Sequence, residues 1–115
     1  STDKETMNNE LGIDGEVADI VDKYAQNAKI AGLDGVVCSP LEAGRVHEKC
    51  GDNFVTVTPG IRFADGEVGD QKRIATPAYA RELGSDYIVV GRPITAAEDP
   101  VAAYNRCVKE FVKGE

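Results

Sequence analysis

The sequence lacks the features of several classes of protein. Its 115 residues contain no run of about 18 apolar residues that could span a membrane, and no basic and apolar leader opens the chain. The formal net charge of −7 disfavours nucleic acid as a bulk partner, because non-specific binding depends on Lys and Arg that neutralise phosphates. We therefore expect a soluble, cytoplasmic protein that binds neither a membrane nor a nucleic acid.

Cysteine and histidine are also scarce. Cys38, Cys50 and Cys107 are widely spaced without a Cys-x-x-Cys pair, which predicts free thiols in a reducing compartment rather than a disulfide framework or a zinc site. Cys38 continues an apolar run and is expected in the core. The one histidine, His47, has charged neighbours, so we expect it on a solvated helix face without a catalytic or ligand role. No metal site is predicted.

What is present is a regular alternation of helices and strands. Serine, threonine or aspartate before proline marks three helix starts, at Ser39, Thr76 and Asp99. A shorter helix follows Thr2 or Asp3, and apolar spacing predicts a longer one over residues 16–31. Short apolar runs predict strands, the first of them buried on both faces, over residues 35–38, 54–58 and 87–90. Apolar residues at helical spacing include Met7, Leu11, Tyr24, Ile30, Leu41 and Val46. In the last helix Val101, Tyr104, Val108 and Phe111 are expected to form a buried stripe.

Two helix-to-strand junctions, residues 32–37 and 84–89, have nearly the same sequence pattern. Repeated βα units of this kind predict a parallel sheet covered by helices. Three strands are too few to close a barrel. We therefore predict an α/β fold, the C-terminal half of a (β/α)8 TIM barrel, with three parallel strands alternating with helices.

The candidate chemistry follows the last two strands. Arg62 comes shortly after residues 54–58, and Gly91 with Arg92 directly follows the final strand. Glycine allows close backbone approach to an oxyanion, and the arginine fork matches phosphate. The long connection between these strands carries Gln71, whose amide is expected to reach the same anion when the loop closes. Pairing of Arg62 and Arg92 with acidic surface residues stays open as the alternative, and Thr95 is either a further contact or a helix cap.

These motifs together carry a resemblance. The runs Asp34-Gly35-Val36-Val37-Cys38-Ser39, Thr58-Pro59-Gly60-Ile61-Arg62, Gly69-Asp70-Gln71-Lys72-Arg73, Ala75-Thr76-Pro77 and Val89-Val90-Gly91-Arg92-Pro93-Ile94-Thr95 strongly resemble bacterial-type orotidine 5′-phosphate decarboxylase. The resemblance implies a carbon–carbon lyase of pyrimidine (UMP) biosynthesis, which converts orotidine 5′-phosphate to UMP and CO₂ without a cofactor. It also implies a homodimer of (β/α)8 barrels, in which residues 1–115 would form the C-terminal part of a single barrel domain, from about the end of strand five through the last helix.

Residue by residue, the resemblance makes Arg62, Gln71, Gly91 and Arg92 substrate-binding positions, with Gln71 and Arg92 on the 5′-phosphate. Ser1 aligns beside a position that contacts the pyrimidine. The family's catalytic Asp-x-Lys-x-x-Asp motif belongs to the first strands and does not occur here, so no catalytic residue is assigned to this chain.

The absent motif has a direct consequence for activity. We expect this 115-residue chain to be inactive without an N-terminal half as its partner. Two alternatives are a related sugar-phosphate barrel enzyme, such as a hexulose-phosphate synthase, and a non-catalytic phosphate-binding or assembly module.

Overall fold

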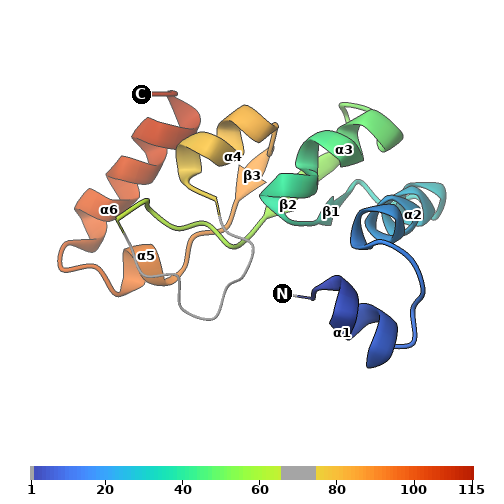
Figure 1. Cartoon of the computed structure of the whole chain (residues 1–115). Helices are drawn as coiled ribbons and strands as arrows, with labels where there is room; N and C mark the ends of the chain where they lie inside the picture. Colours follow the sequence, from blue (N-terminus) through green and yellow to red (C-terminus); the bar gives the residue numbers. More distant parts are fainter. Residues whose placement is uncertain (1, 66–74) are drawn as a thin grey trace.

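The computed structural model describes residues 2–65 and 75–115, in which helices alternate with strands (Figure 1). The helices are α1 (Lys4–Asn9), α2 (Val17–Ile30), α3 (Pro40–Cys50), α4 (Pro77–Leu83), α5 (Arg92–Thr95) and α6 (Pro100–Cys107). The strands are β1 (Gly35–Val37), β2 (Val55–Thr58) and β3 (Tyr87–Ile88). A π-helical turn, Val108–Val112, continues α6.

The strands form one parallel sheet in the order β1-β2-β3. Helix α3 connects β1 to β2, and α4 connects β2 to β3, so each crossover between parallel strands contains a helix. Figure 1 shows α3 and α4 along the same side of the sheet, and the two helices contact each other. The predicted architecture of parallel strands alternating with helices is confirmed.

The two faces of the sheet differ in burial. Thr56 and Thr58 are fully buried, and the Thr56 hydroxyl lies 3.4 Å from the His47 ring on α3, so this face packs on the helices. On the opposite face the register places Val37, Val57 and Tyr87 in one row. Val37 is 71% exposed and Tyr87 is 62% exposed. The prediction that β1 is buried on both faces was therefore wrong, because this face of the sheet is open.

The helix starts predicted from the sequence are confirmed by their caps. The Ser39 hydroxyl accepts from the Leu41 N–H at 3.2 Å, while Glu42 accepts from the Ser39 N–H at 3.0 Å, which completes a capping box. Thr76 and Asp99 accept from backbone N–H groups at the starts of α4 and α6. These bonds satisfy amide groups that a helix start would otherwise leave unpaired.

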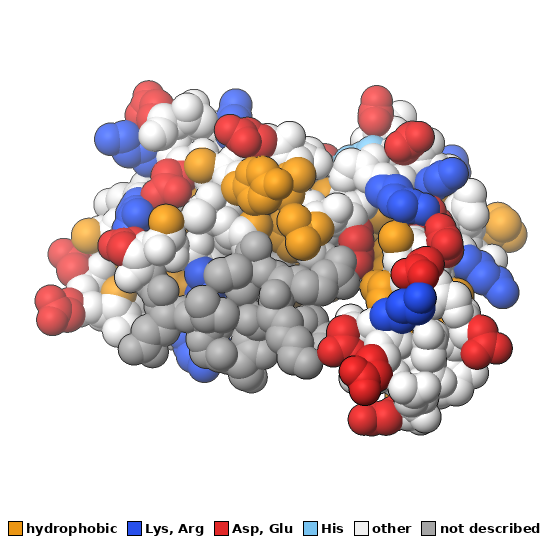
Figure 2. Space-filling model, viewed as in Figure 1, with side chains coloured by type: hydrophobic (Ala, Val, Ile, Leu, Met, Phe, Trp, Pro, Cys, Tyr) orange, Lys and Arg blue, Asp and Glu red, His pale blue; other side chains and the backbone are white. Residues whose placement is uncertain are grey.

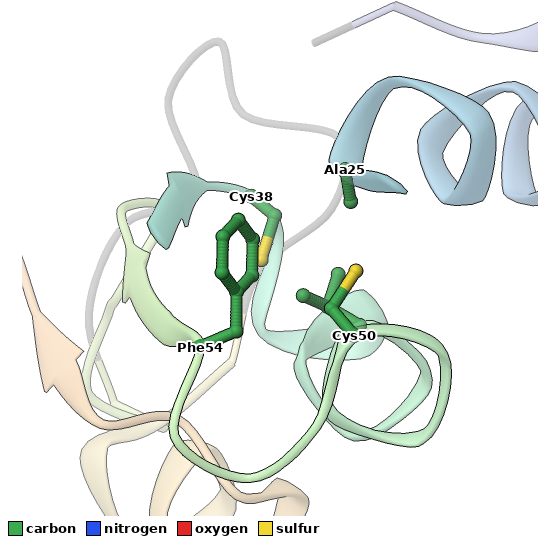
Figure 3. Close-up of a cluster of buried hydrophobic side chains, with 5 residues drawn as sticks. Ala25, Cys38, Cys50 and Phe54 are labelled. Carbon is green, nitrogen blue, oxygen red and sulfur yellow. The ribbon is translucent and has the colours of Figure 1, made fainter. Parts of the chain in front are cut away.

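The main apolar core lies between α2, α3 and the sheet. Ala25, Cys38, Val46, Cys50 and Phe54 form this cluster, and four of them are labelled in Figure 3. The predicted core position of Cys38 is confirmed, and all three cysteines are buried free thiols. Burial raises the pKa of the Cys107 thiol, because the thiolate is poorly solvated there.

Several residues of the apolar stripes are exposed, and the expected burial of Val101 and Tyr104 on the last helix was wrong. Tyr24 and Ile30 on α2 are 58% and 84% exposed, and Val101 and Tyr104 on α6 are also exposed. Leu11 and Leu41 are exposed as well. The residues follow the helical spacing, but a helix face is buried only where another element packs against it. Figure 2 shows hydrophobic side chains gathered on the face that is drawn.

Helix α2 instead buries a charged residue on its inner face. Asp22 is 7% exposed and accepts from Arg45 Nε on α3 at 2.8 Å. Arg45 also donates to Asp19 at 3.0 Å. The hydrogen bond to Asp22 raises the pKa of Arg45. The ion pair explains how an aspartate takes a core-facing position between the two helices, because a buried charge needs a partner.

The connection from β2 to α4 is fixed where it begins and ends. Gly60 has a φ of 78°, the left-handed backbone expected of a glycine after the strand. Ile61 and Ala75 form an isolated parallel bridge, in which the Arg62 N–H donates to the Ala75 carbonyl at 3.0 Å. Residues 66–74, which include Gln71, lie outside the described residues. The predicted loop closure therefore stays a prediction.

Candidate phosphate-binding site

The candidate site begins where β2 and β3 end. Thr58 and Ile88 are register partners, and the Val89 N–H donates to the Thr58 carbonyl at 3.0 Å. Because the two strands are parallel, their carboxyl ends meet at the same edge of the sheet. Arg62 follows one strand end and Arg92 follows the other. Ligands of parallel α/β sheets bind at this edge.

Arg62 lies on a short segment whose backbone is held. Its N–H bonds to Ala75, and the Ala75 N–H in turn donates to the Gly60 carbonyl at 3.2 Å. The side chain is half-buried, and its Nη1 donates to the Ile61 carbonyl at 2.8 Å. The bridge thus fixes the point from which the guanidinium projects.

Gly91 and Arg92 form the turn that enters α5, a helix that was not predicted from the sequence. The Gly91 carbonyl accepts from the N–H groups of Ile94 and Thr95 at 2.9 and 3.0 Å. A Cβ placed on Gly91 would meet no heavy atom within 4 Å, so this glycine borders open space. Arg92 is exposed at the first position of the helix. An anion can therefore approach the backbone here.

Thr95 is not a helix cap in this structure, and its predicted contact with the anion stays a prediction. It lies at the end of α5, and its hydroxyl donates to the Gly91 carbonyl at 3.4 Å. This bond closes the turn around Gly91.

Arg106 was missed at the sequence level. Its guanidinium lies 4.0 Å from the centroid of the Phe63 ring, and Nη1 donates to Asp65 at 3.2 Å. Its Nε donates to Glu110 at 2.8 Å, which raises the pKa of Arg106. The pKa of Asp65 is lowered, first by a hydrogen bond with its own backbone and then by Arg106. The only sequence signal for this cluster was the i,i+4 spacing of Arg106 and Glu110.

The prediction that His47 lies on a solvated face was wrong. Its side chain is only 12% exposed, with Nε2 lying 3.0 Å from Asp86 Oδ2 and 3.1 Å from the Gly84 carbonyl. Asp86 also accepts from the Thr56 N–H at 2.8 Å. Because Asp86 directly precedes β3, this network lies at the amino end of the strand, opposite the edge where Arg92 follows. It joins α3, β2 and β3, which is a structural role.

The described part of the chain offers no other obvious chemistry. In residues 2–65 and 75–115 no group of three or more His, Cys, Asp or Glu side chains could hold a metal ion. Within the same ranges, none of the helices has the length and apolar character needed to cross a bilayer. The arginines at the strand ends are therefore the candidate functional groups.

The sequence profile of the Orotidine 5'-phosphate decarboxylase / HUMPS family matches residues 1–107. The chain belongs to this family. It is 55% identical over 114 residues to the orotidine 5'-phosphate decarboxylase of Bacillus cereus and 58% identical over 111 residues to that of Bacillus cytotoxicus. These matches cover 99% and 96% of this chain but 48% and 47% of the relatives. The chain thus spans about half the length of the curated relatives it matches.

A solved structure leads to the same family. The crystal structure of orotidine 5'-phosphate decarboxylase from Lactobacillus acidophilus superposes with a TM-score of 0.78 at 47% identity. The superposition covers 94% of this chain and 43% of the Lactobacillus acidophilus chain. The family resemblance predicted from the motifs is confirmed, and so is the fold class, part of a (β/α)8 barrel seen here as an open three-stranded sheet.

Proposed function

We propose that this chain is the phosphate- and substrate-binding half of an orotidine 5′-phosphate decarboxylase. The whole enzyme converts orotidine 5′-phosphate to UMP and CO₂, a carbon–carbon lyase reaction of pyrimidine biosynthesis. The observation that carries the proposal is the match to decarboxylases at 55–58% identity. Arg62 and Gly91-Arg92, at the strand edge where barrel enzymes bind phosphate, support it.

The open sheet supports the view that a second half completes the barrel. The row of Val37, Val57 and Tyr87 is apolar and faces away from α3 and α4. In a closed barrel such a face is filled by side chains from the other strands. Residues 1–115 then form the C-terminal part of one barrel domain, from about the end of strand five. An N-terminal half supplies the remaining strands.

The four proposed substrate-binding residues have different roles. Gln71 and Arg92 hold the 5′-phosphate, and Gly91 lets the phosphate approach the backbone. Arg62 adds a second cation from the neighbouring strand end. The phosphate is remote from the carbon that loses CO₂. Binding energy at a remote group accelerates a reaction when it is used to hold the reacting part in its transition-state geometry.

The chemistry itself belongs to the N-terminal half of the enzyme. Loss of CO₂ places negative charge on the pyrimidine, and charged groups at that carbon must stabilise it. The family's Asp-x-Lys-x-x-Asp motif does not occur in this chain. We therefore expect the isolated chain to be inactive and the completed enzyme to be a cytoplasmic homodimer that needs no cofactor. A sugar-phosphate enzyme is the weaker alternative, since the relatives named above are decarboxylases.

The test is reconstitution with a related N-terminal half. This chain is joined behind the N-terminal half of the Bacillus cereus relative to give what we call the completed chimera. We expect it to consume orotidine 5′-phosphate and release UMP. The matched control carries alanine at the aspartate and lysine positions of the N-terminal motif and should be inactive. A folded completed chimera that binds UMP without decarboxylation would favour the non-catalytic module instead.

A further inference from the structure

Arg106 on α6 is held in one orientation by three different partners. Its guanidinium carbon lies over the Phe63 ring, 4.0 Å from the centroid, while Asp65 accepts from Nη1 and Glu110 accepts from Nε. Glu110 lies four residues further along, so it holds the guanidinium from the same stretch of helix. A single exposed ion pair contributes little to stability. A guanidinium fixed on its face and on two of its nitrogens is much better placed to hold a chain segment.

The segment held by Arg106 is the one that carries Arg62. Phe63 directly follows Arg62, and Asp65 comes two residues later. Before Arg62 the chain is fixed by the bridge between Ile61 and Ala75. The Arg62 backbone therefore lies between two attachments, one to the start of α4 and one to α6. Figure 1 shows this segment crossing from β2 to the side of α6.

The same helix also contacts the other half of the candidate site. Helix α6 packs against α5, the helix that begins at Arg92. Through α5 it supports the Gly91-Arg92 turn, and through Arg106 it holds the residues after Arg62. Helix α6 is thus a common support for cations that follow two different strands.

We propose that Arg106 is a positioning residue, which fixes Arg62 relative to the Gly91-Arg92 turn so that both face one phosphate. The inference rests on the proposed function, since Arg62 and Arg92 are substrate-binding groups only there. Arg106 itself does not touch the substrate in this account. Its effect on binding passes through Arg62, which makes the proposal testable by a double-mutant cycle.

The experiment measures UMP affinity in the completed chimera. Arg106→Met removes the charge and the planar fork but keeps an apolar stem beside Phe63. We expect UMP to bind about tenfold more weakly, because small displacements of a binding group are costly, while the thermal midpoint stays within a few degrees. Arg106→Lys keeps the charge without the fork and should restore only part of the affinity. Lys109→Met, an equal charge change on the next turn, is the control and should bind like the unsubstituted chimera.

The cycle with Arg62→Ala separates positioning from general stability. If Arg106 acts through Arg62, Arg106→Met should weaken UMP binding in the parent but change it little in the Arg62→Ala background. Unchanged UMP affinity in Arg106→Met, or losses that add fully in the double variant, would overturn the inference. If Arg106→Met does not fold, Asp65→Asn tests the same coupling and should weaken UMP binding by a smaller factor. Unchanged UMP affinity in Asp65→Asn would also overturn the inference. Failure of the unsubstituted chimera to bind UMP would instead overturn the proposed function, and this inference with it.

Discussion

Thr58 and Ile88 are register partners at the carboxyl ends of β2 and β3, and an arginine follows each of them by four residues. The pairing places the exits of the two strands side by side, so Arg62 and Arg92 leave the sheet from neighbouring points on one edge. Neither arginine alone would indicate a phosphate site. Their matched positions, with Gly91 before one and Gly60 before the other, connect the geometry to the proposed function.

Arg92→Ala should lower turnover of the completed chimera. The guanidinium is proposed to bind the phosphate most strongly in the transition state, so its loss should lower kcat/KM by about 10²–10³-fold, with more of the loss in kcat than in KM. Steady-state kinetics on orotidine 5′-phosphate measure the split. Lys23→Ala, which removes an exposed cation from α2, is the control and should leave KM unchanged. Equal losses in both variants would contradict the proposal.

Two glycines should respond to alanine in opposite ways. A Cβ on Gly91 meets nothing within 4 Å, so Gly91→Ala should fold normally but bind UMP about tenfold more weakly, since the methyl group occupies the space of the phosphate. A Cβ on Gly35 would collide with the Val55 carbonyl oxygen, so Gly35→Ala should lower the free energy of unfolding by about 1–3 kcal/mol.

Calorimetry with UMP and urea unfolding of the completed chimera distinguish the two glycines. Full UMP affinity in Gly91→Ala would show that this glycine does not border the ligand.

His47→Ala should destabilise the fold without changing the site. The substitution leaves the Gly84 carbonyl and the Asp86 carboxylate short of a partner, which should cost about 1–3 kcal/mol in the free energy of unfolding. Glu48→Ala, at the exposed neighbouring position, should change it by less than about 0.5 kcal/mol. Urea unfolding of both variants in the completed chimera gives the comparison. A His47→Ala protein as stable as Glu48→Ala would contradict the structural role of the network.

Acid should weaken the contact between Asp65 and Arg106. The pKa of Asp65 is lowered in the folded chain, by its own backbone hydrogen bond and by Arg106. Because its pKa is lower in the folded chain than in the unfolded chain, ionised Asp65 stabilises the fold. This stabilisation is fully present above the unfolded pKa of about 3.9 and is lost as the pH falls through the folded pKa. Asp65→Asn should therefore flatten the acid side of the stability profile of the completed chimera. The effect is small because the carboxylate is exposed, and identical acid profiles would exclude it.

The isolated 115-residue chain should not decarboxylate orotidine 5′-phosphate. The expected result is no UMP above background from a rigorously purified sample, with activity appearing when the N-terminal half is added. The reason is that groups that hold the phosphate cannot alone stabilise charge on the pyrimidine. Activity of the chain by itself would place catalytic groups within these residues.

The backbone of the fold was predictable because its signals are local. Ser39-Pro40 and Asp99-Pro100 cap helices through bonds within a few residues, and apolar runs of the right length gave β1 and β2. Burial was not predictable in the same way. Tyr24 and Tyr104 follow the correct helical spacing but remain exposed, because their burial depends on surfaces that the local sequence does not describe.

The site was predictable in part for the same reason. Gly91 and Arg92 stand directly after an apolar run, and a strand-end Gly-Arg pair is a local signal. The contacts of Arg106 with Phe63 and of His47 with Asp86 join residues about 40 positions apart, so only the fold brings them together. Charged neighbours suggested a solvated His47, whereas the ring faces the opposite side of its helix, toward β2 and the end of α4.

The central claim is that the carboxyl ends of β2 and β3 form the phosphate site. A crystal structure of the completed chimera with UMP tests it most directly. We expect the 5′-phosphate to lie within about 3 Å of the Arg92 guanidinium and of a backbone N–H in the Gly91-Arg92 turn, with Arg62 on the same side. A phosphate bound at the other end of the strands, beside His47 and Asp86, would contradict the account.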